Sequence, residues 1–494
     1  MSTDAHTDTH EPPAHRHAHA PNRFAVIPTH ARLGADERLT GRGVTVAFLD
    51  SGFYPHPDLT EPLNRVAAFH DTSGEEAAPD PAREPQAFHW HGTMVAVAAA
   101  GNGRLSGGAY RGLASEARVV LVKASAGGRI TEESIARGIE WVIEHRERYG
   151  IRVLNVSLGG DEDVPCSRSL IDGAAERAVA EGVVVVAAAG NQGCGPAPRS
   201  VPPANSPSVI TVGGYDDRNS LDPADLELYC SNYGPTADGT VKPELLAPAA
   251  WVAAPILPNT PAYRTAETLS RLSEAPDYRL RALVRELWRE GGLPEYLLGE
   301  GPSRVRAEVE SLLRANRVVA AHYQHADGTS FAAPVVSSVV AQMLEANPRL
   351  TPAAVKHILV STADRLAGAP ALRQGYGLLN ARRAVEQAAR ETHALDPRTY
   401  GPPRVEGGRL VFSCHDDAAA RVALAGDFNS WRPDQILFTR GGDGLWRAGL
   451  DTPPPGRYRY KFVLDSARWA DDPANGLKEP DGFGGFNSIL HVAR

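Results

Sequence analysis

Short apolar runs alternate with amphipathic stretches over residues 44–390. Five of these runs are almost wholly apolar, as expected of strands that are buried on both faces of a sheet. They are VTVAFLD (44–50), ARVVLVKA (117–124), IRVLNVSL (151–158), GVVVVAAAG (182–190) and SVITVGG (208–214). Between two of them, the stretch 132–148 places Ile135, Ile139 and Val142 at helical spacing. Strands and helices in alternation predict a parallel α/β sheet.

Two changes of pattern interrupt and then end this alternation. Residues 256–322 contain two amphipathic stripes of leucine and valine, which predict a helical hairpin inserted into an α/β domain at 23–390. The stretch 391–405 contains proline and glycine at the density of a linker. Beyond it, short segments alternate between apolar and polar residues and are separated by Gly, Pro and Asp. They predict a small all-β, immunoglobulin-like sandwich at 406–494.

The composition is that of a globular protein with more than one folding unit. The chain has 494 residues, of which 42% are hydrophobic and 22% charged, and this length suits two or three domains. Its apolar runs are far shorter than the roughly 20 residues that cross a bilayer, so no membrane partner is predicted. The formal net charge of −8 is opposite to the basic footprint of nucleic-acid-binding proteins, so no nucleic-acid partner is predicted either.

Residues 1–22 are polar and rich in His, Pro and Ala, which predicts a disordered tail. Its histidines could bind a metal ion, but no apolar pattern accompanies them and we assign them no site. The tail lacks the cationic and apolar regions of a secretory signal, so the expected location is cytoplasmic. The cysteines show no CxxC spacing and are expected to be idle thiols; they are Cys166, Cys194, Cys230 and Cys414.

Three residues have the chemistry of a nucleophilic catalytic unit. Asp50 closes the first apolar strand, His91 opens an alanine-rich helical run, and Ser330 precedes an apolar helix. Each one alone has an ordinary structural explanation as a turn or capping residue. Together they supply a hydroxyl, a base that takes its proton, and an acid that orients and stabilises the base.

Four segments resemble the subtilase family of serine proteases. They are VTVAFLDSGFYPHPDL around Asp50, HGTMVAVAAAGNG around His91, VVVVAAAGNQG around Asn191 and GTSFAAPVVS around Ser330. The chain order Asp, His, Ser is also that of subtilisin. The resemblance implies a subtilisin-like parallel sheet flanked by helices, and a serine endopeptidase that hydrolyses polypeptide substrates through an acyl-enzyme. It implies Asp50, His91 and Ser330 as the triad, and the Asn191 amide as the oxyanion-hole donor.

The same resemblance implies the residues that line the substrate. One segment matches the edge that pairs with an extended peptide and another matches the opposing wall of the primary specificity pocket. The substrate-binding residues are then Ser157, Leu158 and Gly159 on the edge, and Ala188, Ala189 and Gly190 on the wall. Asp58 stands at a common calcium-ligand position of the family, but the loop GNGRLSGGAYRG lacks the oxygen ligands of a calcium cage. No cofactor is therefore predicted, and no metal site is assigned.

The C-terminal region resembles the glycogen-binding module of AMP-activated kinase beta subunits and of starch-branching enzymes. The resemblance runs through RVALAGDFNSW, GRYRYKFVLD, RWADDPAN and GGFNSIL. It implies that Trp431, Lys461, Trp469 and Asn487 contact glycogen or another α-glucan, because indole faces stack on sugar rings while amines and amides bond hydroxyls. The alternative is that both tryptophans pack within a sandwich that only joins domains.

Two other functions remain open at this point. One is a catalytically silent, glycan-targeted scaffold, although the presence of all four chemical residues favours turnover. The other is an exported protease whose signal peptide was missed, in which Cys166 and Cys194, on loops beside the cleft, would form a disulfide.

Overall fold

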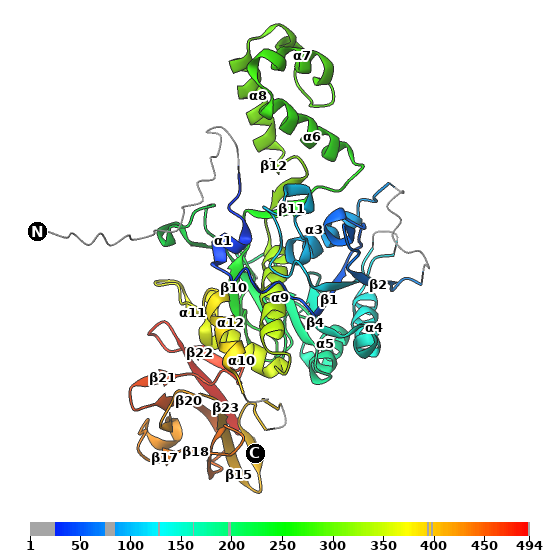
Figure 1. Ribbon diagram of the computed structural model, residues 1–494. Helices are drawn as coiled ribbons and strands as arrows, with labels where there is room; N and C mark the ends of the chain where they lie inside the picture. The colour runs from blue at the N-terminus through cyan, green and yellow to red at the C-terminus, as the bar shows by residue number, and fades with distance from the viewer. Residues whose placement is uncertain are drawn as a thin grey trace, which may run out of the picture.

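The structure is a computed structural model that describes residues 25–492, except 75–83, 127–128, 162, 196–198, 393–394 and 397–398. The predicted tail at 1–22 and its histidines lie outside the described residues. The chain forms an α/β domain, a helical arm that projects from it, and an all-β domain at the opposite end (Figure 1). None of the helices within the described ranges combines the length and the hydrophobicity that a membrane span requires.

Eight strands of the described chain form the central sheet, in the order β10-β6-β5-β4-β1-β3-β2, with β7 paired to β6. They are β1 (Thr45–Asp50), β2 (Val66–Asp71), β3 (Arg118–Lys123), β4 (Ile151–Val156), β5 (Val184–Ala188), β6 (Ile210–Asp216), β7 (Glu227–Leu228) and β10 (Leu245–Pro248). All neighbours pair in parallel except β6 and β7. The five predicted strands are confirmed as β1, β3, β4, β5 and β6. The sequence did not predict β2, a half-buried edge strand, or β10, which is too short to show a pattern.

Helices cover both faces of this sheet. On one face lie α4 (Glu132–Tyr149) and α5 (Leu170–Ala180), and on the other α3 (His89–Ala100), α9 (Thr329–Ala346), α10 (Pro352–Thr362) and α12 (Ala381–Arg390). Successive residues of a strand point to opposite faces. In β1, Ala47 and Leu49 therefore pack with α4 and α5, whereas Val46 and Phe48 pack with α3 and α9. The short helices are α1 (Thr29–Leu33), α2 (Pro57–Thr60) and α11 (Ala371–Gln374).

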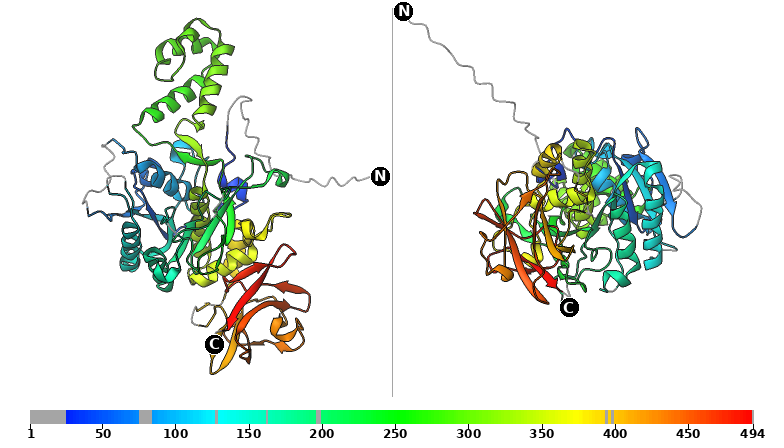
Figure 2. Two further views of the ribbon diagram at one scale, coloured as in Figure 1. Left: turned by 180° about the vertical axis from the view of Figure 1, so that it is seen from behind. Right: turned by 90° about the horizontal axis from the view of Figure 1, so that it is seen from below.

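The insertion at 256–322 forms the projecting arm (Figures 1 and 2). It leaves the domain after β11 (Val252–Pro255) and returns through β12 (Val318–Ala320) and β13 (Tyr323–Ala326), which pair in one small sheet. Among its described residues the arm has three α-helices, α6 (Pro261–Glu274), α7 (Asp277–Leu287) and α8 (Pro302–Ala315), not the predicted hairpin of two. The buried apolar residues of α6 are Ala266, Leu269 and Leu272, a helical stripe that the sequence reasoning overlooked.

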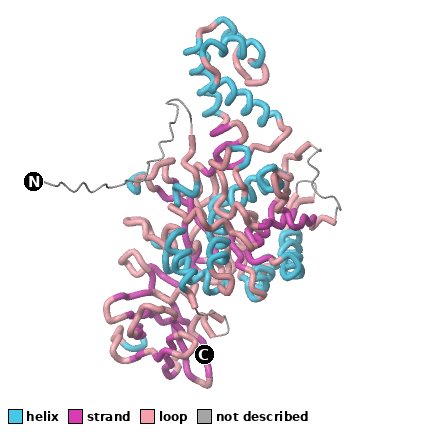
Figure 3. Tube along the Cα trace, in the orientation of Figure 1, coloured by secondary structure: helices cyan, strands magenta, loops and turns pink. Residues whose placement is uncertain are grey.

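The C-terminal domain consists of two antiparallel sheets, seen as the cluster of strands in Figure 3. One contains β14 (Arg404–Glu406), β15 (Arg409–Cys414), β19 (Trp446–Asp451) and β18 (Thr439–Arg440). The other contains β17 (Ile436–Leu437), β16 (Val422–Gly426), β20 (Gly456–Leu464), β23 (Phe486–Val492), β22 (Lys478–Pro480) and β21 (Arg468–Ala470). Phe412, Tyr460 and Phe462 fill the core between them. The predicted sandwich is confirmed.

The two domains are packed against each other. The short strands β8 (Gly234–Pro235) and β9 (Val241–Lys242) of the α/β domain pair with each other. From β9, the Val241 N–H donates to the Gly476 carbonyl of the C-terminal domain at 2.8 Å. Val241 also joins Ala371 and Phe486 in a small apolar cluster between the domains. Within the expected linker, Leu395 and Tyr400 are buried in the core of the α/β domain. The segment that joins the domains is thus fixed by packing at these two side chains.

The arm has a hydrophobic core of its own, which includes Leu269, Leu280 and Val309 and is separate from the core beneath the sheet. Replacing residues 261–315 with a short Gly-Ser linker should therefore leave the α/β domain folded, with a melting temperature within about 5 °C of the intact protein. Thermal unfolding followed by circular dichroism measures this. Loss of the cooperative transition would show instead that the arm is part of the domain's core.

Candidate active site

Asp50 and His91 form a hydrogen-bonded pair at the carboxyl end of the central strand. Asp50 is the last residue of β1, where all six residues are buried, and His91 lies in the first turn of α3. His91 Nδ1 donates to Asp50 Oδ1 at 2.8 Å, and the Ser51 N–H donates to the same oxygen at 2.7 Å. The Asp50 side chain is fully buried, whereas that of His91 is 22% exposed. This bond holds Nδ1 as the donor and leaves Nε2 as the basic nitrogen.

A glycine allows this close approach of α3 to β1. A Cβ atom on Gly92 would lie 2.4 Å from the Gly52 carbonyl oxygen and 2.8 Å from Asp50 Cβ. Any side chain at position 92 would push the helix away from the strand. The Gly that follows His91 in the sequence is therefore what lets the imidazole reach the carboxylate.

Ser330 lies in the first turn of α9, directly after Gly328 and Thr329. The ring of the next residue, Phe331, has its centroid 6.0 Å from that of His91, so the start of α9 adjoins the imidazole. Ser157 Oγ donates to the Ser330 carbonyl at 3.0 Å, and Asn155 Nδ2 donates to Ser157 Oγ at 3.0 Å. The carboxyl end of β4 therefore holds the start of α9 in place.

Asn155 is a positioning residue that the sequence reasoning missed. It is fully buried, and besides its bond to Ser157 it accepts a 2.9 Å hydrogen bond from Ser337 Oγ of α9. A buried amide with partners on both sides fixes the register between β4 and α9, because leaving either partner unpaired costs free energy. A polar residue inside the otherwise apolar run IRVLNV was the signal that could have identified it.

The side chain of Asn191 is oriented by the residue before Ser330. Its Oδ1 accepts hydrogen bonds from Thr329 N at 2.9 Å and from Thr329 Oγ1 at 3.1 Å, so Nδ2 is left as the outward donor. The point that a Cβ on Gly328 would occupy is 3.6 Å from Asn191 Nδ2 and 3.9 Å from Ser330 N. Two N–H donors thus border one small space that is open because residue 328 is glycine. This arrangement suits an oxyanion.

The two segments expected to line the substrate leave neighbouring strands. Val156 of β4 pairs with Ala187 of β5, so both chains emerge at one edge of the sheet, beside the start of α9. The edge residues are Ser157, Leu158 and Gly159, and the wall residues are Ala188, Ala189 and Gly190. The Gly190 N–H donates to Thr329 Oγ1 at 3.1 Å, which ties the wall to the Ser330 segment. The structure brings the three candidate triad residues, Asn191 and both segments expected to line the substrate to one edge of the sheet.

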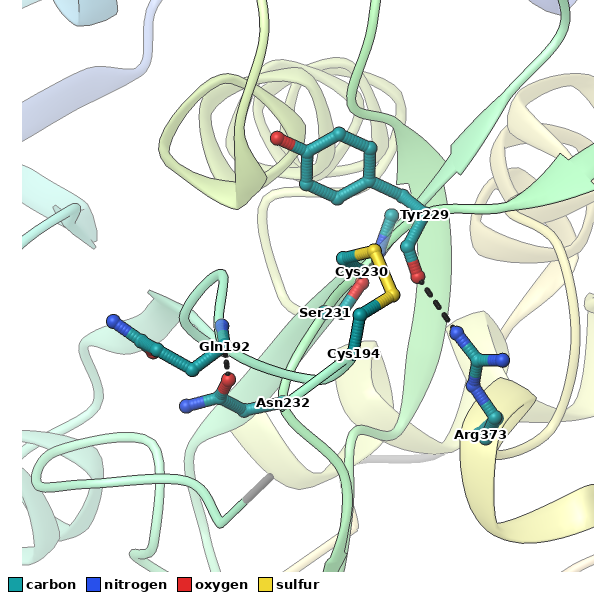
Figure 4. The surroundings of a disulfide bond; sticks show 8 residues. Gln192, Cys194, Tyr229, Cys230, Ser231, Asn232 and Arg373 are labelled. Atoms are coloured by element: carbon teal, nitrogen blue, oxygen red, sulfur yellow. Dashed lines mark hydrogen bonds between the residues drawn. A yellow bond between two sulfur atoms is a disulfide. The ribbon is translucent and has the colours of Figure 1, made fainter. Parts of the chain in front are cut away.

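A disulfide tethers the loop that carries Asn191, and it joins Cys194 to Cys230 (Figure 4). The expectation of idle thiols is wrong for this pair, and the alternative pair with Cys166 is wrong as well, since Cys166 has a free thiol. The reason is a chain contact that sequence spacing does not reveal. The Gly193 N–H donates to the Cys230 carbonyl at 2.8 Å, and the two cysteine Cα atoms lie 5.1 Å apart.

Both carboxylate oxygens of Asp58 accept hydrogen bonds from protein groups. Its Oδ1 accepts from the Leu105 N–H at 3.2 Å and its Oδ2 accepts from the Tyr323 hydroxyl. Both oxygens of this buried carboxylate therefore have protein donors, a set that suits a hydrogen-bonded carboxylate and does not suit a calcium cage, which needs six or more oxygen ligands.

The four candidate sugar-contact residues of the C-terminal domain line one cavity of about 740 Å³. Trp431 and Trp469 lie 6.3 Å apart between ring centroids, with a 33° angle between their planes, and Trp469 is 44% exposed. Lys461 and Asn487 border the same cavity. Phe483, which the sequence analysis did not single out, also lines it and is 95% exposed. The signal available in the sequence was an aromatic residue surrounded by glycines, in the run GFGG at 482–485.

The fold and the first of these sites define a serine protease with an Asp-His-Ser arrangement. Residues 41–377 match the Subtilase family, and residues 399–475 match carbohydrate-binding module 48, described as the isoamylase N-terminal domain. The chain therefore belongs to the subtilase family and carries a carbohydrate-binding module. Asn487 lies beyond the matched range of that module.

Proteins similar in sequence support the assignment to the subtilase family. Over 362 residues the chain is 31% identical to "Serine protease AprX" of Bacillus subtilis, a match covering 71% of this chain and 67% of that protein. It is 35% identical to "Subtilisin Savinase" of Lederbergia lenta over 198 residues, covering 40% of this chain and 65% of that protein. In fold it is similar to fervidolysin from Fervidobacterium pennivorans, a keratinolytic enzyme related to subtilisin. That match has a TM-score of 0.50 and 20% identity, and covers 88% of this chain and 55% of that one.

The pH dependence of activity should follow the pKa of His91. Burial lowers this pKa, but the charge of Asp50 and the hydrogen bond to it raise it, and the net pKa lies above the ordinary value of 6.5. A general base must be neutral, so activity should fall as the pH drops through this raised pKa. A kcat/KM profile should show an acid limb with its midpoint above 6.5.

The variant Asp50→Asn tests whether His91 controls this acid limb, because it removes the charge that raises the His91 pKa. The midpoint of the remaining activity should then move to lower pH, with turnover reduced about ten-thousandfold. An acid limb that stays in place in this variant would mean that a group other than His91 controls it.

The role of Asn191 is tested by two substitutions. Asn191→Leu removes the whole amide, whereas Asn191→Asp keeps the oxygen that accepts from Thr329 and removes the Nδ2 donor. Both should lower kcat by roughly a hundredfold or more with little change in KM, the size of effect known for the oxyanion asparagine of subtilisin. Steady-state kinetics on a peptide substrate measures this. Normal turnover in Asn191→Asp would leave Asn191 with a positioning role only.

Proposed function

We propose that the protein is an endopeptidase in which Ser330 is the nucleophile, His91 the general base and Asp50 the residue that orients the base. The observation that carries the proposal is the 2.8 Å bond from His91 to the buried Asp50, at the sheet edge where the Ser330 helix begins. A serine hydroxyl is a weak nucleophile until a neighbouring base removes its proton. The bond to Asp50 keeps His91 in the tautomer that can do so.

The proposed reaction proceeds through an acyl-enzyme. Ser330 Oγ attacks the peptide carbonyl carbon while its proton passes to His91 Nε2, and the carbonyl oxygen becomes an oxyanion that accepts from Asn191 Nδ2 and Ser330 N. The imidazolium, stabilised by Asp50, then gives its proton to the departing amine as the C–N bond breaks. Water repeats the sequence on the ester and releases the acid. Substrate would reach Ser330 by pairing with the edge at 157–159 as an added strand.

Cleavage-site profiling on a peptide library tests this function directly. The purified full-length protein should cleave internal peptide bonds, and the cleaved sequences give the preferred side chain before the scissile bond. Ser330→Ala should lose at least about a thousandfold in rate, and His91→Ala should lose about as much, since residues of one catalytic unit are not additive. Absence of cleavage by folded wild-type protein would favour the silent scaffold.

We infer that the C-terminal domain binds glycogen or another α-glucan. The support is the shared cavity of Trp431, Lys461, Trp469 and Asn487. The ring of Trp431 packs in part on Ala423, Ala425 and Val463, and its Nε1 donates to Asp427 at 3.0 Å, which would hold the indole as a rigid platform. A half-exposed aromatic with a fixed ring can stack on a sugar without a large loss of side-chain entropy. Such a module would bring the peptidase to glycan stores or to proteins bound on them.

Glucan binding should depend on the exposed indole. Trp469→Ala and Trp431→Ala in the full chain should each weaken binding to a linear α-1,4-glucan at least about tenfold, the equivalent of roughly 1.4 kcal/mol of lost apolar contact. Isothermal titration calorimetry measures the affinity, and Tyr278→Ala, an exposed aromatic of the arm, is the matched control. Unchanged affinity in both variants would return both tryptophans to a packing role.

The compartment in which the protein works is a separate proposal. The cytoplasmic expectation rests on residues that lie outside the described part of the chain. The bond between Cys194 and Cys230 supports the exported alternative, because disulfides persist mainly in oxidising compartments. Thiol titration of denatured protein from its native host separates the two: two free thiols point to export, and four point to a reducing compartment.

A further inference from the structure

The cavity that holds the candidate sugar contacts is not formed by the C-terminal domain alone. One of its lining residues is Arg365, which belongs to the α/β domain and lies between α10 and α11. Arg365 is exposed and faces the same space as Trp431, Lys461, Trp469 and Asn487. All the sugar contacts implied by the family resemblance belong to the C-terminal module. The cavity that they line also includes a cationic side chain of the peptidase domain.

Arg365 is held in this place by bonds to both domains. Its Nη1 donates to the Gly484 carbonyl of the C-terminal domain at 2.6 Å and to the Gly375 carbonyl of its own domain at 3.4 Å. Its guanidinium also lies 5.8 Å from the ring centroid of Phe486. These contacts fix the direction of the side chain, so its donors are preorganised at the cavity wall.

The loop that Arg365 contacts is the one that carries Phe483. Asp481 organises this loop by accepting from the Phe483 N–H at 2.7 Å and the Gly485 N–H at 3.0 Å, and it also pairs with Lys461. The charge of Lys461 is therefore already matched within the module. Arg365 forms no salt bridge within 4.0 Å among the described residues, although its charge helps to lower the pKa of Asp471, another residue of the cavity lining. The hydrogen bonds of Arg365 in the described part of the chain use Nη1, which leaves Nε and Nη2 as further donors.

We propose that the α-glucan site is shared between the domains, with the unused N–H groups of Arg365 donating to sugar hydroxyls on the peptidase side of the cavity. This inference rests on the proposed glucan function of the module. An arginine fork suits pairs of neighbouring hydroxyls because its donors are coplanar and held at a fixed spacing. A bound glucan would then touch both domains, and the peptidase would be held in one orientation on the glycan.

Calorimetry of the full chain with maltoheptaose tests the shared site. Arg365→Ala and Arg365→Met should each weaken binding about five- to tenfold, because both remove the charged donors. Met keeps an unbranched stem that can pack on Phe486, so it separates loss of donors from loss of packing. Arg382→Ala, an exposed arginine of α12 outside the cavity, is the matched control and should bind as wild type does. Trp469→Ala is the positive control for loss of binding.

The outcomes separate this inference from the function on which it rests. If wild-type protein does not bind maltoheptaose, the glucan function fails and the shared site with it. If wild type binds and both Arg365 variants stay within twofold of it, the site belongs to the module alone. Weak binding in Arg365→Ala with normal binding in Arg365→Met would also overturn the proposal, because only packing would then matter. Weakened binding in both variants supports it.

Discussion

The architecture of the catalytic half depends on one buried interaction, the bond between the Asp50 carboxylate and His91. A charge that is removed from water is costly unless protein donors replace the water. Asp50 is fully buried; its Oδ1 receives the donors of Ser51 and His91, and its Oδ2 has no hydrogen-bond partner among the described residues. To supply them, β1 must end where it does, α3 must begin beside it, and residue 92 must lack a side chain. The His91 imidazole is thereby fixed at the carboxyl edge of the sheet, where helix α9, which carries Ser330, begins.

A second set of constraints holds the nucleophile segment against that pair. The Ser330 carbonyl accepts a hydrogen bond from Ser157 Oγ, which in turn accepts one from Asn155 of β4. The Thr329 N–H donates to the side chain of Asn191, in the loop after β5. These polar links cross between an apolar sheet and an almost wholly buried helix, where an unpaired group would be costly. They therefore specify the position of α9 more sharply than apolar packing, which tolerates sliding.

The sequence predicted the parts of the fold that show long, uniform patterns. Strands buried on both faces, such as β1 and β5, appear as continuous apolar runs, and the long helix α4 has a clear stripe. The triad residues were found through family resemblance, since their individual patterns are those of ordinary turns and caps. The edge strand β2 was missed because partial burial leaves little periodicity, whereas the helix α6 was overlooked although its buried apolar residues also form a stripe.

Other features could not be predicted because they depend on contacts between distant segments. The pairing of Cys194 with Cys230 follows from the course of two loops, and no cysteine spacing encodes it. The presence of Arg365 in the cavity of the candidate sugar contacts follows from how the domains dock, through contacts such as that of Val241 with Gly476. A motif search within either domain alone would not find such a residue.

We infer that Ser330, activated by His91 and Asp50, is the nucleophile. The most direct measurement is peptide mapping by mass spectrometry after reaction of the native protein with a fluorophosphonate, which forms a stable covalent adduct with an activated serine. We expect one adduct, on the peptide that contains Ser330, and its loss in His91→Ala. An adduct on a different serine, or peptide hydrolysis by a protein in which Ser330 stays unmodified, would contradict it.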